Sequence, residues 1–442
     1  METTKMSASK AMAQALAQTD PKLEERDNGT KIEEPEAAPK EIKTNEVKLK
    51  RVARPIRHVR HVPLKSLIFY SKRGPVEFSY DGKIKLPIPK NKLVVEVSYA
   101  GLNPVDMKIK NGYQTGIYGA AGLGREFSGV ITHVGENVQS EWNEGDEVYG
   151  ILFHPHQAVG TLQTSILVDP RTDPIMLKPL SLSMKEASGA LYTLGTAYNI
   201  LDKLQRKGSL KQDSNICIIG GTTSVGMAAI QLLKKYYNLY PLITVVTRGN
   251  GCSVLRKKFP TIAKELVFIN YLTCRGKISG PLKQMIEAGK TTNYDEESNE
   301  EYTVEYNQGK YDIILDFVGG YDVLAHSNSL IHSGGNYVTT VGDYVANYKE
   351  DVYNSADNPS ANMRKAFGSM FWLYNYTHFQ FDPSASTSKK NNWMGKCNEL
   401  LESKTIKVVV DKTYDWKKYE EALSYMLTQR AQGKIILKVE KF

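Results

Sequence analysis

Residues Asn215–Lys235, NICIIGGTTSVGMAAIQLLKK, contain the turn that decides the fold of this chain. The apolar run Ile216–Ile219 predicts a buried strand, and the apolar periodicity from Val225 onward predicts a helix. Between these elements, Gly221 and Gly226 keep the first and third glycines of a G-x-G-x-x-G frame. That frame places a cofactor pyrophosphate at a helix N-terminus. The segment therefore predicts a strand, a turn of the nucleotide-binding type and a helix.

Thr223 stands at the second glycine of this frame. That glycine normally lets the backbone approach the pyrophosphate. We therefore expect the Thr223 side chain to crowd the phosphate position, so that a dinucleotide binds weakly. The alternative is a Ser/Thr turn that caps the helix and holds no ligand. The cofactor-contacting residues expected from the frame and its surroundings are Gly220, Gly221, Thr222, Thr223, Ser224, Val225, Gly226, Arg248 and Gly319.

The length and composition indicate a soluble globular protein. A chain of 442 residues allows two or three domains, and 41% of its residues are hydrophobic and 24% charged. We expect no membrane span and no signal peptide, because no apolar run has the required length. The four cysteines form no C-x-x-C pair, and Cys217 falls in a predicted core strand, which favours a reduced cytoplasmic chain. The net charge of +9 favours anionic surfaces without selecting one.

Patterning along the chain indicates a polar tail followed by two kinds of folded segment. Residues 1–50 carry few large apolar side chains, so we expect them to be disordered. The alternating run Leu93–Val97 predicts a strand-rich segment. From about Leu191, strands alternate with helices, which is typical of a parallel, doubly wound sheet. Lys277–Lys310 interrupts this pattern with acidic residues and is expected to be an exposed insertion.

Six blocks of sequence carry a family resemblance: Ser98–Gly112, Gly124–Gly150, Ala187–Leu201, Tyr311–Gly320, Ser333–Gly342 and Gly433–Val439. They resemble, in order, the medium-chain dehydrogenase/reductases of the quinone-reductase branch. The resemblance implies an α/β fold with a GroES-like β-rich domain over residues 51–190 and a doubly wound Rossmann domain over 191–365. It also implies a polar insertion near 277–310 and a return to the first domain over 366–442.

A closer likeness covers nearly the whole chain. It rests on VKLKRVARPIRHVRHVPLKSL at 47–67, RGPVEFSYDGKIKLPIPKNKLVVEVSYAGLNPVDMKI at 73–109, DFVGGYD at 316–322 and TTVGDYVANYKED at 339–351. These stretches resemble the yeast AST proteins, a family implicated in delivering the plasma-membrane proton ATPase to the cell surface. The likeness includes the altered TTSVG turn. It implies a cytoplasmic factor, peripheral on endomembranes and plasma membrane, whose partner is that ATPase.

The chain lacks the metal ligands of zinc-dependent members of the superfamily. Those members carry a catalytic Cys near the first motif and Gly-His-Glu in the second, where this chain has NPVD at 103–106 and GRE at 124–126. The four-cysteine pattern of a structural zinc site is also missing from the sequence. His154 and His156 lie two residues apart without a third ligand, so we expect no metal site.

Any dinucleotide bound by this chain should be NADP(H), although no cofactor is certain. NAD-binding turns are followed, about 20 positions on, by an acidic residue that binds the ribose. Here the second strand ends in Val245-Val246-Thr247-Arg248, with no acid, and Arg248 suits a 2′-phosphate. The alternative for Arg248 is a solvated arginine at a strand end.

The candidate cleft residues come from the resemblance to zinc-free quinone reductases. It implies Asn103 near a nicotinamide, with Asp106, Tyr113 and Arg125 around the cleft. Residue type alone leaves a structural alternative, because Asn103 before Pro104 could end a strand and Asp106 could cap the next turn. No Ser/His/Asp or Cys/His constellation is evident in the sequence, so no confident catalytic residue emerges.

Four arginines recur at three-residue spacing in KLKRVARPIRHVRH at 48–61. They are Arg51, Arg54, Arg57 and Arg60. Pro55 disfavours a helix interior, whereas a polyproline-II arm would align all four along one edge. Such a row could bind an anionic membrane surface, or simply link the tail to the body. Nucleic acid is not expected, because no aromatic interleaving or nucleic-acid module accompanies the row.

Two functions of different classes follow from the sequence. The first is a non-catalytic or weakly catalytic peripheral factor for membrane delivery of the proton ATPase. The second is an NADPH-dependent, zinc-independent reductase of quinones or enones. The altered turn and the likeness to AST proteins favour the first function. The sequence leaves open whether the chain forms a homo-oligomer.

Overall fold

The computed structural model describes residues 61–72, 74–112, 119–152, 159–295, 300–345, 347–348, 359–371, 373–383 and 392–441. All of them belong to one compact unit, His61–Phe442. The tail expected over residues 1–50 and the arginine row therefore lie outside the described residues. So do Tyr113, His154 and His156.

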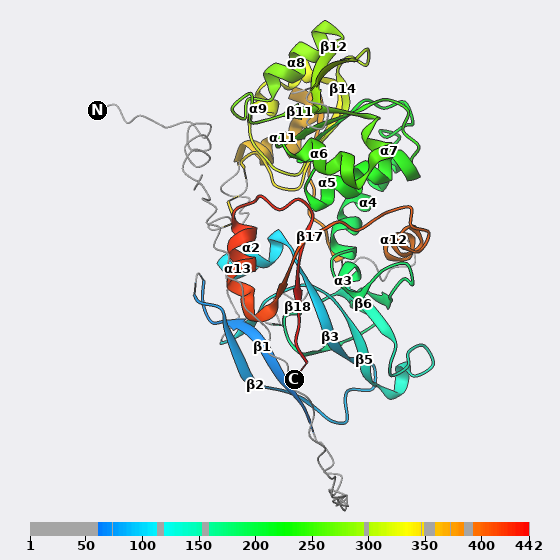
Figure 1. Cartoon of the computed structure of the whole chain (residues 1–442), viewed down its shortest axis with the longest axis vertical. Coiled ribbons are helices and arrows are strands. Elements are labelled where there is room, and N and C mark those ends of the chain that lie inside the picture. Colours follow the sequence, from blue (N-terminus) through cyan, green and yellow to red (C-terminus); the bar gives the residue numbers. More distant parts are fainter. Residues whose placement is uncertain are drawn as a thin grey trace, which may run out of the picture. The chain divides into compact units, whose positions relative to one another are not determined.

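A parallel sheet of six strands forms the centre of one half of this unit (Figure 1). Its order is β11-β10-β9-β14-β15-β16, and every neighbouring pair is parallel. With β9 counted first, this is the 3-2-1-4-5-6 order of doubly wound dinucleotide-binding folds. The strands are β9 (Ile216–Ile219), β10 (Ile243–Thr247), β11 (Leu266–Asn270), β14 (Tyr311–Asp316), β15 (Ile331–Thr339) and β16 (Asn375–His378). The predicted doubly wound sheet is confirmed.

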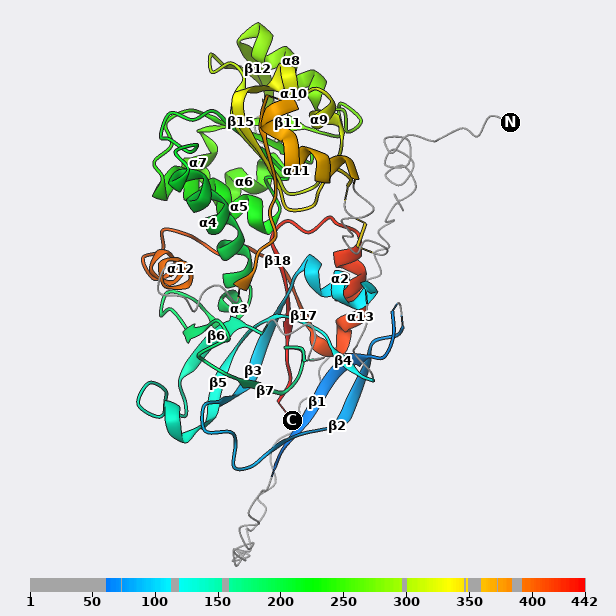
Figure 2. The same ribbon diagram turned by 180° about the vertical axis from the view of Figure 1, so that it is seen from behind.

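Helices cover both faces of this sheet, which explains why its central strands are apolar throughout. Alternate residues of β9 point to opposite faces, since Ile216 and Ile218 join one core cluster and Cys217 and Ile219 join another. The first cluster includes residues of α4 (Leu191–Arg206), α5 (Ser224–Gln231), α6 (Gly251–Lys258), α7 (Pro260–Ala263) and α12 (Trp393–Glu402). The second includes residues of α8 (Ser279–Ala288), α9 (Asp322–Ala325), α10 (Ser327–Leu330) and α11 (Pro359–Phe371). Both sets are visible in Figures 1 and 2.

The other half is built on a seven-stranded sheet in the order β17-β18-β3-β5-β6-β8, with β7 paired to β3. Its strands are β3 (Leu93–Leu102), β5 (Glu126–Val134), β6 (Glu147–Ile151), β7 (Ser165–Val168), β8 (Ile175–Leu177), β17 (Val410–Asp415) and β18 (Lys434–Lys438). A smaller sheet contains β2 (Glu77–Lys85), β1 (His61–Phe69) and β4 (Ala121–Gly122). One core cluster joins these strands to α2 (Pro104–Gly112) and α13 (Tyr419–Leu427).

Two features differ in detail from the sequence expectations. The six-stranded sheet continues to β16, and α12 packs on α4, so the chain reaches the other sheet only at β17, later than residue 366. The segment 277–310 is not a wholly exposed insertion, because α8 buries Leu282 and Met285 against the sheet. Its polar character belongs to the hairpin of β12 (Lys290–Asp295) and β13 (Glu300–Glu305). Among the described helices, none is long and apolar enough to cross a bilayer.

Candidate functional site

Thr223 is the N-cap of α5. Its backbone is extended, with φ −66° and ψ 155°, and its hydroxyl accepts a hydrogen bond from the Gly226 amide at 3.0 Å. The same hydroxyl donates to the Gly220 carbonyl oxygen at 2.8 Å. The side chain thus holds one of the amides that a helix N-terminus otherwise leaves without a partner. Thr223 therefore has the helix-capping role that the sequence offered as the alternative to a ligand-binding turn.

The two remaining glycines of the frame serve close packing between strand and helix. A Cβ atom at Gly221 would lie 2.1 Å from Cγ1 of Val245 on β10. A Cβ atom at Gly226 would lie 2.3 Å from the Gly220 carbonyl oxygen. Both distances are far below van der Waals contact, so glycine is needed at these positions whether or not a ligand binds.

The turn as a whole fits a dinucleotide only in part. Its glycines give the strand–turn–helix geometry, but the Gly226 amide is already bound to the Thr223 hydroxyl. The Thr223 methyl and hydroxyl also stand where the frame requires no side chain. The residues present therefore do not provide the close backbone approach that holds a pyrophosphate, and no reaction step through NADP(H) follows from this geometry.

The end of β10 carries the residues expected at the ribose. Thr247 and Thr222 are both buried, and their hydroxyl oxygens lie 3.0 Å apart. Arg248 is half-buried, and no hydrogen bond or ion pair engages its guanidinium within the described part of the chain. Gly319 has a positive φ of 82°, and a Cβ atom there would lie 2.1 Å from the Tyr344 carbonyl oxygen.

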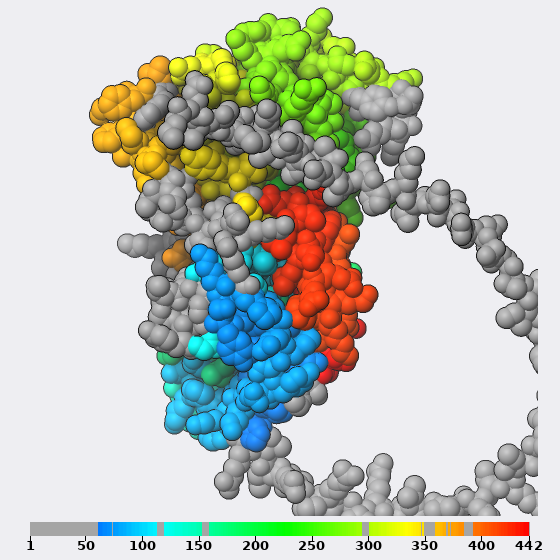
Figure 3. Space-filling view, turned by 90° about the vertical axis from the view of Figure 1, so that its left-hand side faces the viewer, coloured from blue at the N-terminus to red at the C-terminus, as the bar shows by residue number. Residues whose placement is uncertain are grey.

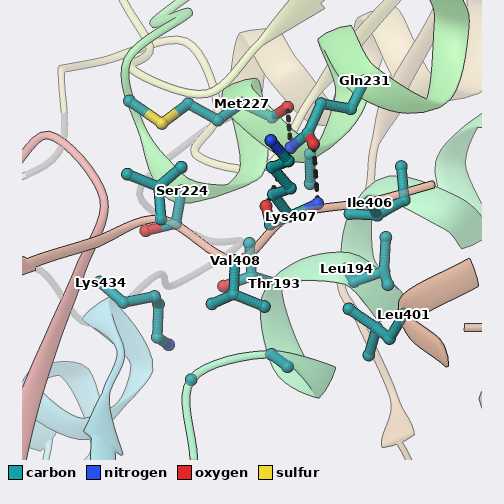
Figure 4. Close-up of a pocket in the computed structure, with 14 residues that line it drawn as sticks. Thr193, Leu194, Ser224, Met227, Gln231, Leu401, Ile406, Lys407, Val408 and Lys434 are labelled. Atoms are coloured by element: carbon teal, nitrogen blue, oxygen red, sulfur yellow. Dashed lines mark hydrogen bonds between the residues drawn. The ribbon is translucent and has the colours of Figure 1, made fainter. Parts of the chain in front are cut away.

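A pocket that is open to solvent lies beside the turn (Figure 4). Ser224 and Lys434 lie on one side of it, and Leu194, Leu401 and Ile406 on the other. The pocket is lined by Gly189, Ala190, Thr193, Leu194, Ser224, Met227, Ala228, Gln231, Leu401, Ile406, Lys407, Val408, Val409 and Lys434. Ser224 is the one expected cofactor-contacting residue in this lining. Most of the other lining residues are apolar.

The chain segment along this pocket is fixed by Gln231 of α5. Its side-chain oxygen accepts a hydrogen bond from the Lys407 amide at 2.8 Å, and its side-chain nitrogen donates to the Lys407 carbonyl oxygen at 3.1 Å. Gln231 is 1% exposed. These two hydrogen bonds satisfy the backbone of Lys407, which lies in no strand, and hold residues 406–409 against α5.

Lys434, which lines the pocket, forms a buried polar triad with Glu126 and Asn103. The Lys434 ammonium donates to Oδ1 of Asn103 at 2.7 Å and to Oε2 of Glu126 at 2.9 Å. The Asn103 amide nitrogen donates to Oε2 of Glu126 at 3.1 Å, and the Tyr192 backbone amide donates to Oε1 at 2.9 Å. The three side chains are at most 3% exposed. They meet because β3, β5 and β18 are neighbours in the sheet.

Asp106 and Arg125 are buried beside this triad. Oδ2 of Asp106 accepts the Asn103 backbone amide at 2.7 Å, so the carboxylate caps the start of α2. Burial raises the pKa of Asp106 to about 6, although the positive charge of Arg125 opposes the shift. Arg125 donates to the carbonyl oxygens of Gly124 at 2.7 Å and Val159 at 2.6 Å. Asp106 Oδ1 and Arg125 Nε have no hydrogen-bond partner among the described residues.

Metal ligands do not gather in the described part of the chain: no group of three or more His, Cys, Asp or Glu side chains is placed to hold an ion there. The four cysteines are free thiols. Cys217 and Cys397 are fully buried, and burial raises the pKa of both thiols.

Comparison with known proteins places the chain in a family. Residues 89–166 match the alcohol dehydrogenase GroES-like domain, and residues 286–437 match the zinc-binding dehydrogenase domain. The chain is 60% identical over 428 residues to Protein AST1 of Saccharomyces cerevisiae, covering 97% of this chain and 99% of that protein. Protein AST2 of the same organism is 57% identical over 429 residues, with the same coverage. The chain belongs to the AST protein family.

Solved structures confirm the fold of this AST-family chain. The quinone oxidoreductase from Coxiella burnetii is 20% identical, with a TM-score of 0.59, and the match covers 86% of this chain and 100% of that one. The CurK enoyl reductase is 20% identical, with a TM-score of 0.60 and coverage of 85% and 99%. The predicted combination of a GroES-like and a Rossmann domain is thus confirmed, on a medium-chain dehydrogenase/reductase scaffold.

Sequence reasoning did not single out Glu126 or Lys434 in this AST-family chain. Each begins a strand that is mostly apolar: Glu126 precedes FSGVITHV and Lys434 precedes IILKV. A charged residue at the start of a core strand was the available signal. Their pairing was not visible, because 308 residues separate them.

Proposed function

We propose that this chain assists delivery of the plasma-membrane proton ATPase to the cell surface, as a peripheral membrane factor that does not depend on cofactor turnover. The family implies this role, and identity of 60% to Protein AST1 over almost the whole length supports carrying it over. The observation that carries the non-catalytic part is the bond between the Thr223 hydroxyl and the Gly226 amide. This bond occupies the Gly226 amide, which a cofactor phosphate would need as a hydrogen-bond donor.

The polar groups near the pocket support the same proposal. The triad is bonded within itself, since the Lys434 ammonium and the Asn103 amide both donate to Glu126. A buried ion pair that is already complete loses stability when one partner is drawn away. These side chains therefore serve the fold better than they would serve a reacting substrate.

Two substitutions of Thr223 separate cofactor binding from delivery. Asp and Asn are both good N-caps, so Thr223→Asp and Thr223→Asn each keep the cap, but only Asp adds a charge that repels phosphate. In S. cerevisiae lacking Protein AST1 and Protein AST2, the chain should restore surface delivery of the pump under stress. We expect both variants to restore it equally, measured by imaging the tagged ATPase.

Rescue by the Asn variant but not the Asp variant, at equal abundance, would indicate a nucleotide-dependent role. Absence of rescue by the unmodified chain would instead refute the delivery function itself. The two failures are distinguishable because the unmodified chain is tested beside both variants.

The second candidate function is an NADPH-dependent, zinc-independent reductase of quinones or enones. It is favoured by Arg248, whose guanidinium has no partner among the described residues and stands at the end of β10. Titration of the purified chain with NADPH tests this candidate. Low-micromolar binding that Arg248→Ala weakens for NADPH but not for NADH would support it. Equally weak binding of both nucleotides would count against it.

A further inference from the structure

The connections that lead into strands β9, β10 and β11 are strongly basic. They are residues 202–213, 234–242 and 256–265, which contain ten lysines and arginines but three acidic residues. The whole chain, by contrast, has 57 basic and 48 acidic residues. Because the three strands are parallel neighbours, their first residues lie at one edge of the six-stranded sheet. We call the three connections the basic edge; they include the ends of α4 and α6 and all of α7 (Figure 1).

Hydrogen bonds join the three connections to one another. The Tyr240 backbone amide donates to the Gln212 carbonyl oxygen at 2.8 Å, and the Tyr240 hydroxyl donates to Oε1 of Gln212 at 3.0 Å. The Ile243 amide donates to the Glu265 carbonyl oxygen at 3.1 Å, and the Lys234 ammonium lies 2.7 Å from the Glu265 carboxylate. The basic edge is therefore one pre-formed surface, and little ordering entropy is lost when it binds a partner.

Most of the positive charge on the basic edge has no counter-ion. Arg206 pairs with Asp202 at 2.6 Å and Lys234 pairs with Glu265, which leaves Asp213 as the only other acidic residue of these connections. Seven lysines are exposed and form no ion pair with any described residue: Lys203, Lys207, Lys211, Lys235, Lys257, Lys258 and Lys264. Like charges held on one surface repel one another, so an anionic partner would relieve a cost that the free protein carries.

We propose that the basic edge is a docking surface for an anionic lipid bilayer. Lysines near a bilayer of acidic lipids each add to binding, and the flexible point charge of lysine suits headgroups that offer no fixed geometry. Tyr240 is 73% exposed among these lysines, and tyrosine is enriched at the boundary between membrane and water. A protein partner would instead call for an apolar centre. On these connections Tyr240 is the only large apolar side chain that is exposed.

This assignment rests on one part of the proposed function, the association with membranes. It places a lipid contact on the folded body, separate in sequence from the arginine row at residues 51–60. Two basic surfaces on one chain would raise the avidity for a bilayer above that of either alone. Vesicles that contain no ATPase test this contact by itself, whereas rescue of pump delivery by the unmodified chain tests the function.

Charge reversal at three lysines tests the docking surface. Lys207→Glu, Lys211→Glu and Lys264→Glu are combined in the full chain, and circular dichroism checks the fold. The parent should pellet with vesicles of equimolar phosphatidylserine and phosphatidylcholine but not with phosphatidylcholine alone. Because each lysine near an acidic surface contributes about fivefold, the triple variant should bind at least about fiftyfold more weakly. Added salt should weaken binding of the parent, since it screens the charges.

A matched control makes the same change of net charge elsewhere. Lys83→Glu, Lys85→Glu and Lys185→Glu alter exposed lysines outside the basic edge. Lys83 and Lys85 lie on β2, which belongs to the half that contains α13, and Lys185 lies on α3 (Met184–Ala187). Figure 3 shows this half, with the first strands in blue beside the C-terminal elements in red. The control should bind the vesicles like the parent, because its changed charges lie on other elements and are screened.

Three results would overturn the assignment. One is a parent chain that does not pellet with the phosphatidylserine vesicles. Another is a control that loses as much binding as the triple variant, which would mean that net charge alone decides. The third is a triple variant that binds vesicles like the parent but has lost binding to polyglutamate, which would make an acidic protein segment the partner of the basic edge.

Discussion

At the start of α5, one hydroxyl group determines what the turn can bind. Thr223 spans the Gly220 carbonyl and the Gly226 amide, so the cap is complete without a ligand. A glycine at this position would open the approach that the motif needs but leave the amide without a partner. With threonine in place of the motif's glycine, the helix N-terminus is capped without a ligand. This is possible because a side-chain oxygen and a phosphate oxygen can accept the same hydrogen bond.

Removing that hydroxyl should restore affinity for NADPH. In Thr223→Gly with Ser224→Gly, the helix amides face the cleft freely, and we expect the dissociation constant to fall about tenfold, as for one charged hydrogen bond. The lost cap costs only a few tenths of a kcal/mol when glycine replaces it. Fluorescence titration measures the change, with Thr223→Ser as the control that keeps the hydroxyl. Unchanged affinity in the double glycine variant would disprove the crowding explanation.

Asp106 should make stability depend on pH. Its pKa is raised from 3.8 to about 6, so the folded state favours the protonated carboxyl, and the stabilisation present below about pH 4 is lost as pH rises through 6. Asp106→Asn keeps an oxygen to accept the Asn103 amide but carries no charge. Relative to the parent, the variant should gain stability by up to about 1.4 kcal/mol per pH unit between these values.

Urea unfolding of both proteins at several pH values measures this difference. A parallel pH profile for parent and variant would mean that the Asp106 carboxyl is not desolvated as its position requires.

At the scale of elements, the packing of α5 on β9 and β10 should tolerate no side chain at Gly226. In Gly226→Ala, the new Cβ would lie 2.3 Å from the Gly220 carbonyl oxygen, so the helix must shift. We expect a loss of about 1–3 kcal/mol, as for overpacking. Gly280→Ala in α8 is the control, because nothing lies within 4 Å of its Cβ position. Thermal unfolding that lowers the midpoint equally for both variants would contradict this packing argument.

The arginine row remains a prediction from sequence. If the row binds anionic lipid, changing Arg51, Arg54, Arg57 and Arg60 to Glu should abolish pelleting with phosphatidylserine vesicles. Added salt should have the same effect on the parent chain, because it screens the charges. Equal pelleting of parent and variant would identify the row as a plain linker.

At the scale of the whole molecule, local patterns predicted the fold and missed the contacts between distant segments. The strand Ile216–Ile219 and the capping role of Thr223 follow from neighbouring residues, and the structure has both. The burial of Leu282 and Met285 was hidden because the segment around them is polar on average. The triad was not predictable, since Asn103 and Lys434 are 331 residues apart and meet only when β18 pairs with β3 in the seven-stranded sheet.

The insertion of β18 between β17 and β3 has a consequence for synthesis on the ribosome. The seven-stranded sheet begins at Leu93 and must wait for Lys434–Lys438, whereas the six-stranded sheet has all its strands once His378 has emerged. The half that is translated first is therefore completed last. Until then the end of β3, residues 99–102, is paired only on the β5 side, and an unpaired strand edge is prone to aggregate. A nascent chain of this protein should depend on chaperones mainly during that interval.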